Sequence, residues 1–227
     1  MDIRTMYSLL TRMPLLQGIN GMELARIEEQ AQLQIEQVSA SRHPFIKQGD
    51  ICKSLIFLVS GTMNKETLSA DKVYKATETI CGPAVIEADR LFGLQCEYAS
   101  TYRLPVECQI MQVMKQDVVL HMLKNDIFRT NYINMISAKL HRQQIALQCK
   151  KFGTPESKIR HFITKQFSLT AGKKYLDIKM TDLAEYIGET RLTVSIVLNR
   201  WKEERIIDLK RKEIVIDDIT RFVSAHE

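Results

Sequence analysis

The sequence has no hydrophobic run long enough to cross a membrane. Its most apolar stretch, residues 54–61 (SLIFLVSG), has the length of a β-strand, whereas a membrane-spanning helix needs about 18 apolar residues. Residues 1–14 (MDIRTMYSLLTRMP) lack the apolar core and the small-residue cleavage site of a secretory signal. We therefore expect a cytoplasmic protein that makes no contact with a membrane.

Cysteine is scarce and scattered. The five cysteines, at positions 52, 81, 96, 108 and 149, are odd in number, and no two of them form a Cys-x-x-Cys pair. This spacing indicates neither a disulfide framework nor a zinc site, and buried reduced thiols are the ordinary role of such cysteines. The sequence also lacks a Ser-His-Asp or Cys-His arrangement, a phosphate-binding glycine loop and a His-Glu metal spacing. We predict no catalytic residues, no metal site and no enzymatic activity.

The composition is that of a globular protein. The 227 residues are 45% hydrophobic and 26% charged, which is enough for one large domain or two ordinary ones. The net charge of +5 fits a polyanionic partner, but bulk charge does not locate a binding site.

The first half of the chain changes from a helical to a strand pattern. Residues 1–35 show apolar positions at helical spacing, interrupted by Gly18 and Gly21. From residue 33 to about residue 113, short β-forming segments are separated by turn signals, among them Gly49-Asp50 and Ser60-Gly61. This spacing predicts an antiparallel sandwich or roll, a fold that commonly encloses a ligand pocket.

A long helix is predicted over residues 127–150, after a short helical segment from about residue 116. Its apolar positions follow a heptad spacing, with one polar interruption. Because a second flank of the helix is free to cover the β domain, we expect the heptad flank to form a homodimer seam; internal packing is the alternative. The predicted seam consists of Ile133, Ile136, Leu140, Gln143 and Leu147.

Two short helices meeting at a fixed angle are predicted between Met180 and Arg200. Leu183, Ala184 and Ile187 form one apolar face, Gly188 supplies the turn, and Val194, Val197 and Leu198 form a second face. This is the pattern of a helix-turn-helix. The residues left on the outer face of the second helix are Thr190, Arg191, Leu192, Ser195, Ile196, Asn199 and Arg200.

Flanking segments complete this picture. Gly153, Thr154 and Pro155 suit a helix end followed by a capped helix start, so we place a domain boundary there. After the second helix, residues 206–217 alternate apolar and polar positions about a basic tip, as in a β-hairpin wing. We predict an α+β chain with a β-roll sensor domain over residues 1–115, a short helix plus a long dimerisation helix over 116–151, and a winged helix-turn-helix domain over 152–227.

With these features in this order, the chain resembles the CRP/FNR family of bacterial transcription regulators. Residues 14–27 are similar to the family's opening helix, residues 45–64 to its first β-roll hairpins with their Gly-Asp turn, and residues 187–207 to its recognition-helix region. The resemblance implies a cyclic-nucleotide-binding-like β-roll and a homodimer on palindromic double-stranded DNA. It also implies contact with RNA polymerase.

The chain departs from the family in the residues that bind the effector. Cyclic-nucleotide members hold the ribose with a Gly-Glu pair and the phosphate with an Arg-Ser pair, and residues 85–108 have neither in place; Tyr98 and Ala99 stand about where the Arg-Ser pair would. Iron-sulfur members have an N-terminal cysteine cluster, whereas the first cysteine here is Cys52. The sequence therefore argues against both cofactors.

Haem remains an open alternative, which would make the protein a nitric oxide or redox-responsive regulator of the same family. Haem needs an apolar pocket and one or two axial ligands that leave no spacing signature. The conceivable ligands are His43, His121, His141, Met63, Met135 and Cys149, and for the effector pocket itself we name Tyr98, Arg103, Tyr132 and Met135.

The resemblance assigns the DNA contacts. Arg191 stands where the family's arginine reaches guanine, while Leu192 and Ile196 replace residues that hydrogen-bond bases, so they are expected to contact thymine methyl groups. Thr190, Ser195 and Asn199 are expected to hydrogen-bond bases or phosphates. The backbone contacts are assigned to Arg200, Lys210, Arg211 and Lys212.

Two hypotheses from other classes of protein compete with that of a transcription regulator. One is a β-barrel enzyme or ligand-binding protein that does not bind DNA, against which the absence of a catalytic constellation speaks. The other is a cyclic-nucleotide-regulated interaction module, which the missing phosphate site and the predicted winged helix both disfavour.

Overall fold

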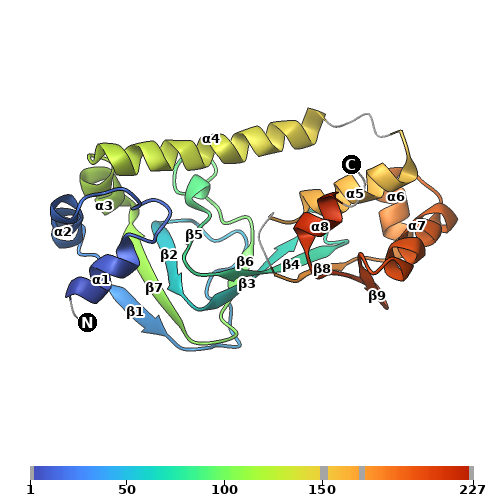
Figure 1. Cartoon of the computed structure of the whole chain (residues 1–227), viewed down its shortest axis with the longest axis horizontal. Helices are drawn as coiled ribbons and strands as arrows, with labels where there is room; N and C mark the ends of the chain where they lie inside the picture. Colours follow the sequence, from blue (N-terminus) through green and yellow to red (C-terminus); the bar gives the residue numbers. More distant parts are fainter. Residues whose placement is uncertain (1–2, 149–152, 169–171, 225–227) are drawn as a thin grey trace. The chain divides into compact units, whose positions relative to one another are not determined.

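The computed structural model describes residues 3–148, 153–168 and 172–224, and these form two compact units (Figure 1). Unit 1 consists of Met1–Met63 and Cys81–Arg142, and unit 2 consists of Asn64–Ile80 and Gln143–Glu227. The units differ from the predicted domains at two places. Residues 64–80, expected within the β-roll, belong to unit 2, and the other division between the units falls between Arg142 and Gln143, within the predicted long helix.

Unit 1 contains an antiparallel sheet with the strand order β1-β7-β2-β5. Strand β2 is its most buried strand, because every residue from Ser54 to Val59 is shielded from solvent. The strands are β1 (Ile35–Val38), β2 (Ser54–Ser60), β5 (Ala84–Ile86) and β7 (Cys108–Met114), with the short β6 (Thr101–Arg103) in the same half of the chain.

The helices of unit 1 precede and follow this sheet. Helix α1 spans Ile3–Leu10, and α2 spans Gly21–Gln30. Helix α2 begins where it does because the Asn20 side chain accepts the amide of Glu23 at 2.9 Å, which satisfies one of the free N–H groups of the first turn. The later elements are the 3₁₀-helix η1 (Ala88–Arg90), α3 (Lys115–Asp117), the π-helical η2 (Val118–Met122) and α4 (Asp126–Gln148).

Helix α4 has two flanks of different character, as the heptad pattern predicts. Phe128 and Tyr132 are buried in unit 1, whereas Ile133 and Leu140 are 55% and 54% exposed. Figure 1 shows α4 running alongside the rest of unit 1. One flank therefore closes the hydrophobic core, and the other presents apolar side chains without a partner in the described part of this chain.

Unit 2 combines a helical bundle with an antiparallel sheet whose strands run in the order β3-β4-β8-β10-β9. The predicted C-terminal elements are present as α5 (Pro155–Lys165), β8 (Lys174–Asp177), α6 (Met180–Ile187), α7 (Arg191–Glu203), β9 (Asp208–Lys210), β10 (Glu213–Ile216) and α8 (Ile219–Ser224). The predicted cap of α5 is confirmed, since Thr154 accepts the amide of Ser157 at 3.2 Å and Pro155 fills the first turn.

Two strands from the first half of the chain extend this sheet. They form a hairpin, β3 (Thr62–Leu68) and β4 (Lys75–Cys81), and β4 pairs with β8 in antiparallel register from Lys75 opposite Asp177 to Glu78 opposite Lys174. The tip of the hairpin therefore belongs structurally to unit 2.

The core of unit 2 surrounds Trp201, the single tryptophan of the chain. Its side chain is fully buried, and the ring of Phe222 packs edge-on against it at 5.3 Å between centroids. Arg160 stacks over the same indole at 4.7 Å. This core fixes α5, α7 and α8 against one another.

None of the described helices combines the length and the apolar character needed to span a bilayer.

Candidate nucleic-acid interface

The turn between α6 and α7 depends on Gly188. Its φ of +69° lies in the left-handed region, and an added Cβ would meet no atom within 4 Å, so backbone conformation and not space favours glycine here. The turn also closes the end of α6, because the amide of Glu189 donates to the Ala184 carbonyl at 3.0 Å. The predicted helix-turn-helix is therefore present, with its turn at the predicted residue.

Helix α7 begins with a side-chain cap. The Thr190 hydroxyl accepts the amide of Thr193 at 3.1 Å. Arg191 is then the first helical residue, and it is exposed. Among the residues that the structure describes, none forms a hydrogen bond or an ion pair with its guanidinium group, so all of its donors face solvent.

The two faces of α7 divide as the sequence predicts. Val194, Leu198 and Trp201 are buried, each less than 2% exposed. On the outer face, Leu192 is 71% exposed and Ile196 is 61% exposed. Two large apolar side chains are thus exposed to solvent beside an unpaired arginine. Exposed apolar side chains that lie together indicate a surface that binds a partner.

A basic hollow of about 350 Å³ lies between the start of α6, the start of α7 and the β9–β10 turn. Arg191 lines it together with Lys210, Arg211 and Lys212, which confirms that α7 and the wing share one surface. Lys179, just before α6, is a fifth basic residue of this lining. Sequence reasoning missed Lys179, although a lysine at the first turn of the first helix is a signal that could have revealed it.

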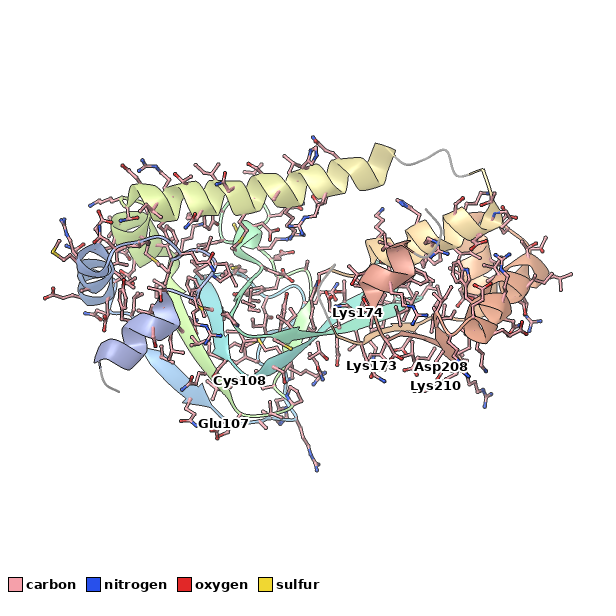
Figure 2. All side chains as sticks on the ribbon, viewed as in Figure 1. Glu107, Cys108, Lys173, Lys174, Asp208 and Lys210 are labelled. Carbon is pink, nitrogen blue, oxygen red and sulfur yellow. The ribbon has the colours of Figure 1, made fainter. Side chains whose placement is uncertain are left out.

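The wing holds its basic tip in a defined conformation. Lys212 adopts a positive φ of 64°, and its carbonyl accepts the amide of Ile178 at 2.8 Å, which ties the turn to the segment before α6. Lys210 forms a surface ion pair with Glu213 at 3.1 Å, and this hydrogen bond raises the pKa of Lys210. The ammonium group of Lys210, which is labelled in Figure 2, therefore remains charged at neutral pH.

Three predicted contact residues lie farther along α7 and are engaged within the chain. Arg200 donates to Glu156 on α5, and Asn199 donates to the Ser195 hydroxyl at 3.2 Å. Glu156 also accepts the indole N–H of Trp201 at 2.9 Å. Arg200 is thus anchored to α5, and it is not among the residues that line the basic hollow.

The β3–β4 hairpin holds the outer side of α6. Tyr186 donates to Asp71 at the hairpin tip, and Tyr74 packs edge-on against both Tyr186 and Phe162, at 5.4 and 5.3 Å between ring centroids. The hydrogen bond to Asp71 raises the pKa of Tyr186 to about 12. These contacts brace α6, on which the position of α7 depends.

A buried ionic cluster joins the hairpin to the C-terminal strands. Glu78 on β4 receives Lys65 at 2.8 Å and Lys174 at 2.9 Å, and it also accepts the hydroxyl of Ser168. Of these residues, Lys174 is labelled in Figure 2. Burial opposes the ionisation of Glu78, but the Lys65 charge and the hydrogen bonds from these partners outweigh it, so its pKa is lowered. Nothing in the local sequence pattern signalled this cluster.

The residues predicted for an effector pocket all lie in unit 1. Tyr98 and Tyr132 are buried, and burial raises the pKa of both hydroxyls. The Tyr132 hydroxyl donates to the Ala88 carbonyl. Met135 is partly buried, whereas the Arg103 guanidinium donates to the Arg42 carbonyl at 3.0 Å. The structure thus accounts for Tyr132 and Arg103 through contacts within the chain.

Glu87 is held by two hydrogen-bond donors of unit 1. Its carboxylate accepts the amide of Ala99 at 2.6 Å and the hydroxyl of Tyr102 at 2.9 Å. Its backbone has a positive φ of 37°, which a non-glycine residue rarely adopts.

The candidate haem ligands differ in their exposure to solvent. Within the described part of the chain, no group of three or more His, Cys, Asp or Glu side chains is placed to hold a metal ion. His43 and His141 are exposed, His121 is partly buried and Met63 is fully buried. Cys149 lies outside the described residues.

The predicted dimer seam lies on the outer flank of α4. Ile133 and Leu140 are exposed, Ile136 is partly exposed and Gln143 is exposed. Leu147 is in the same helix, but its side chain lies outside the described part of the structure. Ile133, Ile136 and Leu140 therefore present an apolar strip that is at least partly exposed to solvent.

Comparisons with known proteins agree with this geometry. Residues 158–224 match the model of the Crp-like helix-turn-helix domain. Electron transport regulator A of Shewanella oneidensis is 24% identical over 189 residues, which cover 76% of this chain and 70% of that protein.

Solved structures show the same fold over almost the whole chain. The catabolite activator protein of Thermus thermophilus matches with a TM-score of 0.54 and 16% identity, covering 93% of this chain and 99% of that one. A regulator of the CRP/FNR family from Eubacterium rectale matches with a TM-score of 0.53 and 16% identity, covering 93% and 97%. The predicted fold class is confirmed.

Proposed function

We propose, for a chain that belongs to the CRP/FNR family of transcription regulators, that it binds double-stranded DNA in a sequence-specific manner as a homodimer on a palindromic site. One observation carries this proposal: the unpaired Arg191 guanidinium shares a basic hollow with the wing and stands next to the exposed Leu192 and Ile196. Polar donors, apolar contacts and backbone-binding charge then occur on one surface, as direct readout in a major groove requires.

Arg191 is the residue that we assign to a guanine. A guanidinium group that is free of internal partners donates two parallel hydrogen bonds to the O6 and N7 atoms of guanine, and the first turn of a recognition helix is the part that reaches the base edges. Arg200 is unsuited to this role because Glu156 already holds it.

Leu192 and Ile196 supply a different kind of discrimination. Neither side chain donates or accepts a hydrogen bond, so neither distinguishes bases by polar contacts. The C5 methyl group of thymine is the one apolar feature in the major groove. We assign both side chains to thymine methyl groups, and the half-site should therefore place thymines next to the guanine read by Arg191.

The basic residues of the wing and of the α6 start are assigned to the phosphate backbone. Lys212 and Arg211 lie at the wing tip, and Lys179 lies across the hollow from them. Such contacts orient the protein without reading sequence, and they release counterions, so they make binding depend on salt.

The homodimer is assigned to the outer flank of α4. Ile133 and Leu140 are one heptad apart, and Ile136 lies between them, so the three form a strip of the kind that a parallel coiled coil buries. Two-fold symmetry then pairs two copies of α7 with half-sites one or more helical turns apart, about 34 Å per turn.

The effector is proposed to be something other than a cyclic nucleotide. The Glu87 carboxylate uses the Ala99 amide, and a phosphate brought to the same place would meet that negative charge at close range. The engagement of RNA polymerase rests on the family alone.

Selection of binding sites from a pool of random duplexes tests the proposal. Purified protein should enrich a palindromic sequence, and its affinity for that duplex should exceed its affinity for a scrambled duplex by at least about 10³-fold, the lower end for specific DNA-binding proteins. Enrichment of no sequence, with equal affinity for all duplexes, would reject a specific regulator. Titration of the same protein with cyclic AMP, followed by calorimetry, should give no heat of binding.

A further inference from the structure

We propose that Cys52 and Cys96 in unit 1 form a redox-active pair that a peroxide converts to a disulfide and a thiol reductant converts back. Cys52 lies just before β2, and Cys96 lies in the segment between η1 and β6. They are 44 positions apart, so no local pattern in the sequence pairs them.

The backbone brings the two cysteines opposite each other. Ile51 and Glu97 form an antiparallel bridge, flanked by hydrogen bonds from Tyr98 N to Asp50 O at 2.9 Å and from Cys52 N to Cys96 O at 2.6 Å. In an antiparallel ladder, the next pair after this bridge is Cys52 opposite Cys96, with both side chains on the same face.

The spacing of such a pair suits a disulfide. Directly opposed residues of a hydrogen-bonded pair have Cα atoms about 5.5 Å apart, and disulfides form at Cα separations of about 4.4–6.8 Å. The bond therefore requires side-chain rotation and no large backbone movement. In the reduced protein, Cys52 Sγ donates to the Ser54 carbonyl at 3.5 Å, and Cys96 Sγ donates to the Gly93 carbonyl at 3.1 Å.

The surroundings of the two sulfur atoms assign the order of reaction. Cys52 is 3% exposed, and burial raises the pKa of its thiol, to which the nearby Cys96 also contributes. Cys96 is partly exposed. Because the thiolate is the nucleophile, the accessible Cys96 reacts with the oxidant first and Cys52 resolves the product.

The reaction balances with hydrogen peroxide as the oxidant. The Cys96 thiolate attacks one peroxide oxygen, the O–O bond breaks, and the sulfenic acid forms with release of one water once a proton is taken up. The Cys52 sulfur then attacks the sulfenic sulfur, its proton leaves with the hydroxyl group as a second water, and the S–S bond forms. Two electrons pass from the two sulfur atoms to the peroxide. A dithiol reductant reverses the bond by thiol–disulfide exchange.

The bond would form beside the buried core of unit 1. Tyr98 is two residues beyond Cys96 and lies close enough to hydrogen-bond Cys52, and Ala99 holds the Glu87 carboxylate. The disulfide would therefore constrain the segment from Cys96 to Ala99, which contains Tyr98, one of the residues predicted for the effector pocket.

Mass spectrometry of the folded full-length chain tests the pair. The protein is treated with an equimolar amount of hydrogen peroxide, quenched with catalase, alkylated and digested without reduction. The experiment is run in a Cys81→Ser, Cys149→Ser background, which removes an exposed thiol and one that lies outside the described residues. We expect a loss of two mass units, a linked peptide joining positions 52 and 96, and complete reversal by dithiothreitol.

Two further variants separate this outcome from nonspecific oxidation. Cys96→Ser should abolish the linked peptide and leave Cys52 free to alkylate only slowly, because it is buried. Cys108→Ser, which removes another buried cysteine, should leave the link intact. Circular dichroism of each variant verifies the fold before oxidation. A linked peptide with any other pairing, or an unchanged mass in folded protein, would overturn the proposal, and neither result bears on DNA binding.

Discussion

Lys174 and Glu78 form a buried ion pair, with Nζ and Oε2 2.9 Å apart and with side chains that are 0% and 3% exposed. The pair joins β4 to β8, strands that are about a hundred positions apart in the chain, and Lys65 and Ser168 complete the cluster. The fixed position of the helix-turn-helix relative to the β3–β4 hairpin therefore depends on charge that is shielded from water.

Glu78→Gln should destabilise unit 2 strongly. The substitution leaves the Lys174 ammonium group buried without its counter-charge, and breaking a buried pair in this way costs about 3–5 kcal/mol. Fluorescence of Trp201, the single tryptophan, reports the urea unfolding of unit 2. Lys75→Ala removes one partner of the exposed pair with Asp177 in the same two strands, and it should cost less than about 1 kcal/mol. Equal effects of the two substitutions would contradict the role of burial.

The stability of unit 2 should fall in acid because of the same carboxylate. The pKa of Glu78 is lowered in the folded protein, so its contribution is fully present above the unfolded value of about 4.3 and is lost as the pH falls through the folded pKa. Unfolding midpoints measured from pH 7 down to pH 3 should decline more steeply below about pH 4.3 in the wild type than in Glu78→Gln. Parallel pH profiles of the wild type and Glu78→Gln would show that Glu78 does not contribute to the loss of stability in acid.

The selected operator should respond to the loss of single thymine methyl groups. Replacing a thymine by deoxyuridine removes the C5 methyl alone, and burial of one methyl group contributes about 0.8 kcal/mol, or roughly a four-fold change in affinity. The effect should appear at the thymines near Leu192 and vanish in the Leu192→Ala protein, as a double-mutant cycle requires. A deoxyuridine effect of the same size in both proteins would show that Leu192 does not contact that methyl.

The outer flank of α4 should determine the oligomeric state. Leu140→Glu places a charge in the predicted apolar seam and should shift sedimentation equilibrium from dimer to monomer at micromolar concentration. Asn134→Glu, an exposed position on the same helix, is the matched control and should leave the dimer intact. A wild-type protein that sediments as a monomer, or a Leu140→Glu protein that remains a dimer, would contradict this assignment.

The helix-turn-helix could be predicted from the sequence because its determinants are local. The periodic positions around Leu183 and Val194, the left-handed turn at Gly188 and the cap at Thr190 lie within a few residues of one another. The antiparallel strands and the capped start of α5 at Pro155 were predictable for the same reason.

The remaining features depend on long-range pairing, which local patterns do not encode. The register of β4 against β8 places residues 64–80 in unit 2, although the sequence pattern assigned them to the β-roll. The pairing of Arg200 with Glu156 spans 44 positions and changes the role expected of Arg200. Lys179 became a candidate only when the fold brought the start of α6 next to the wing.

Wing residues should affect DNA binding differently from Arg191. Lys212→Ala should weaken binding to all duplexes alike and reduce the salt dependence, by a slope of about one per half-site. Lys173 offers a matched control, because it is an exposed lysine paired with Asp217. It precedes β8, at the opposite end of that strand from Ile178, whose amide donates to the Lys212 carbonyl. Lys173→Ala should leave binding unchanged.

The affinity of Arg191→Ala for the selected operator is the most direct test of the central claim. Loss of the bidentate guanine contact should cost about 1–3 kcal/mol per half-site, or roughly 5- to 150-fold, and should relax the preference at one base pair of each half-site while other positions keep theirs. Both changes should be absent in Lys173→Ala. An Arg191→Ala protein with the footprint, affinity and base preference of the wild type would contradict the assignment of this surface as the DNA reader.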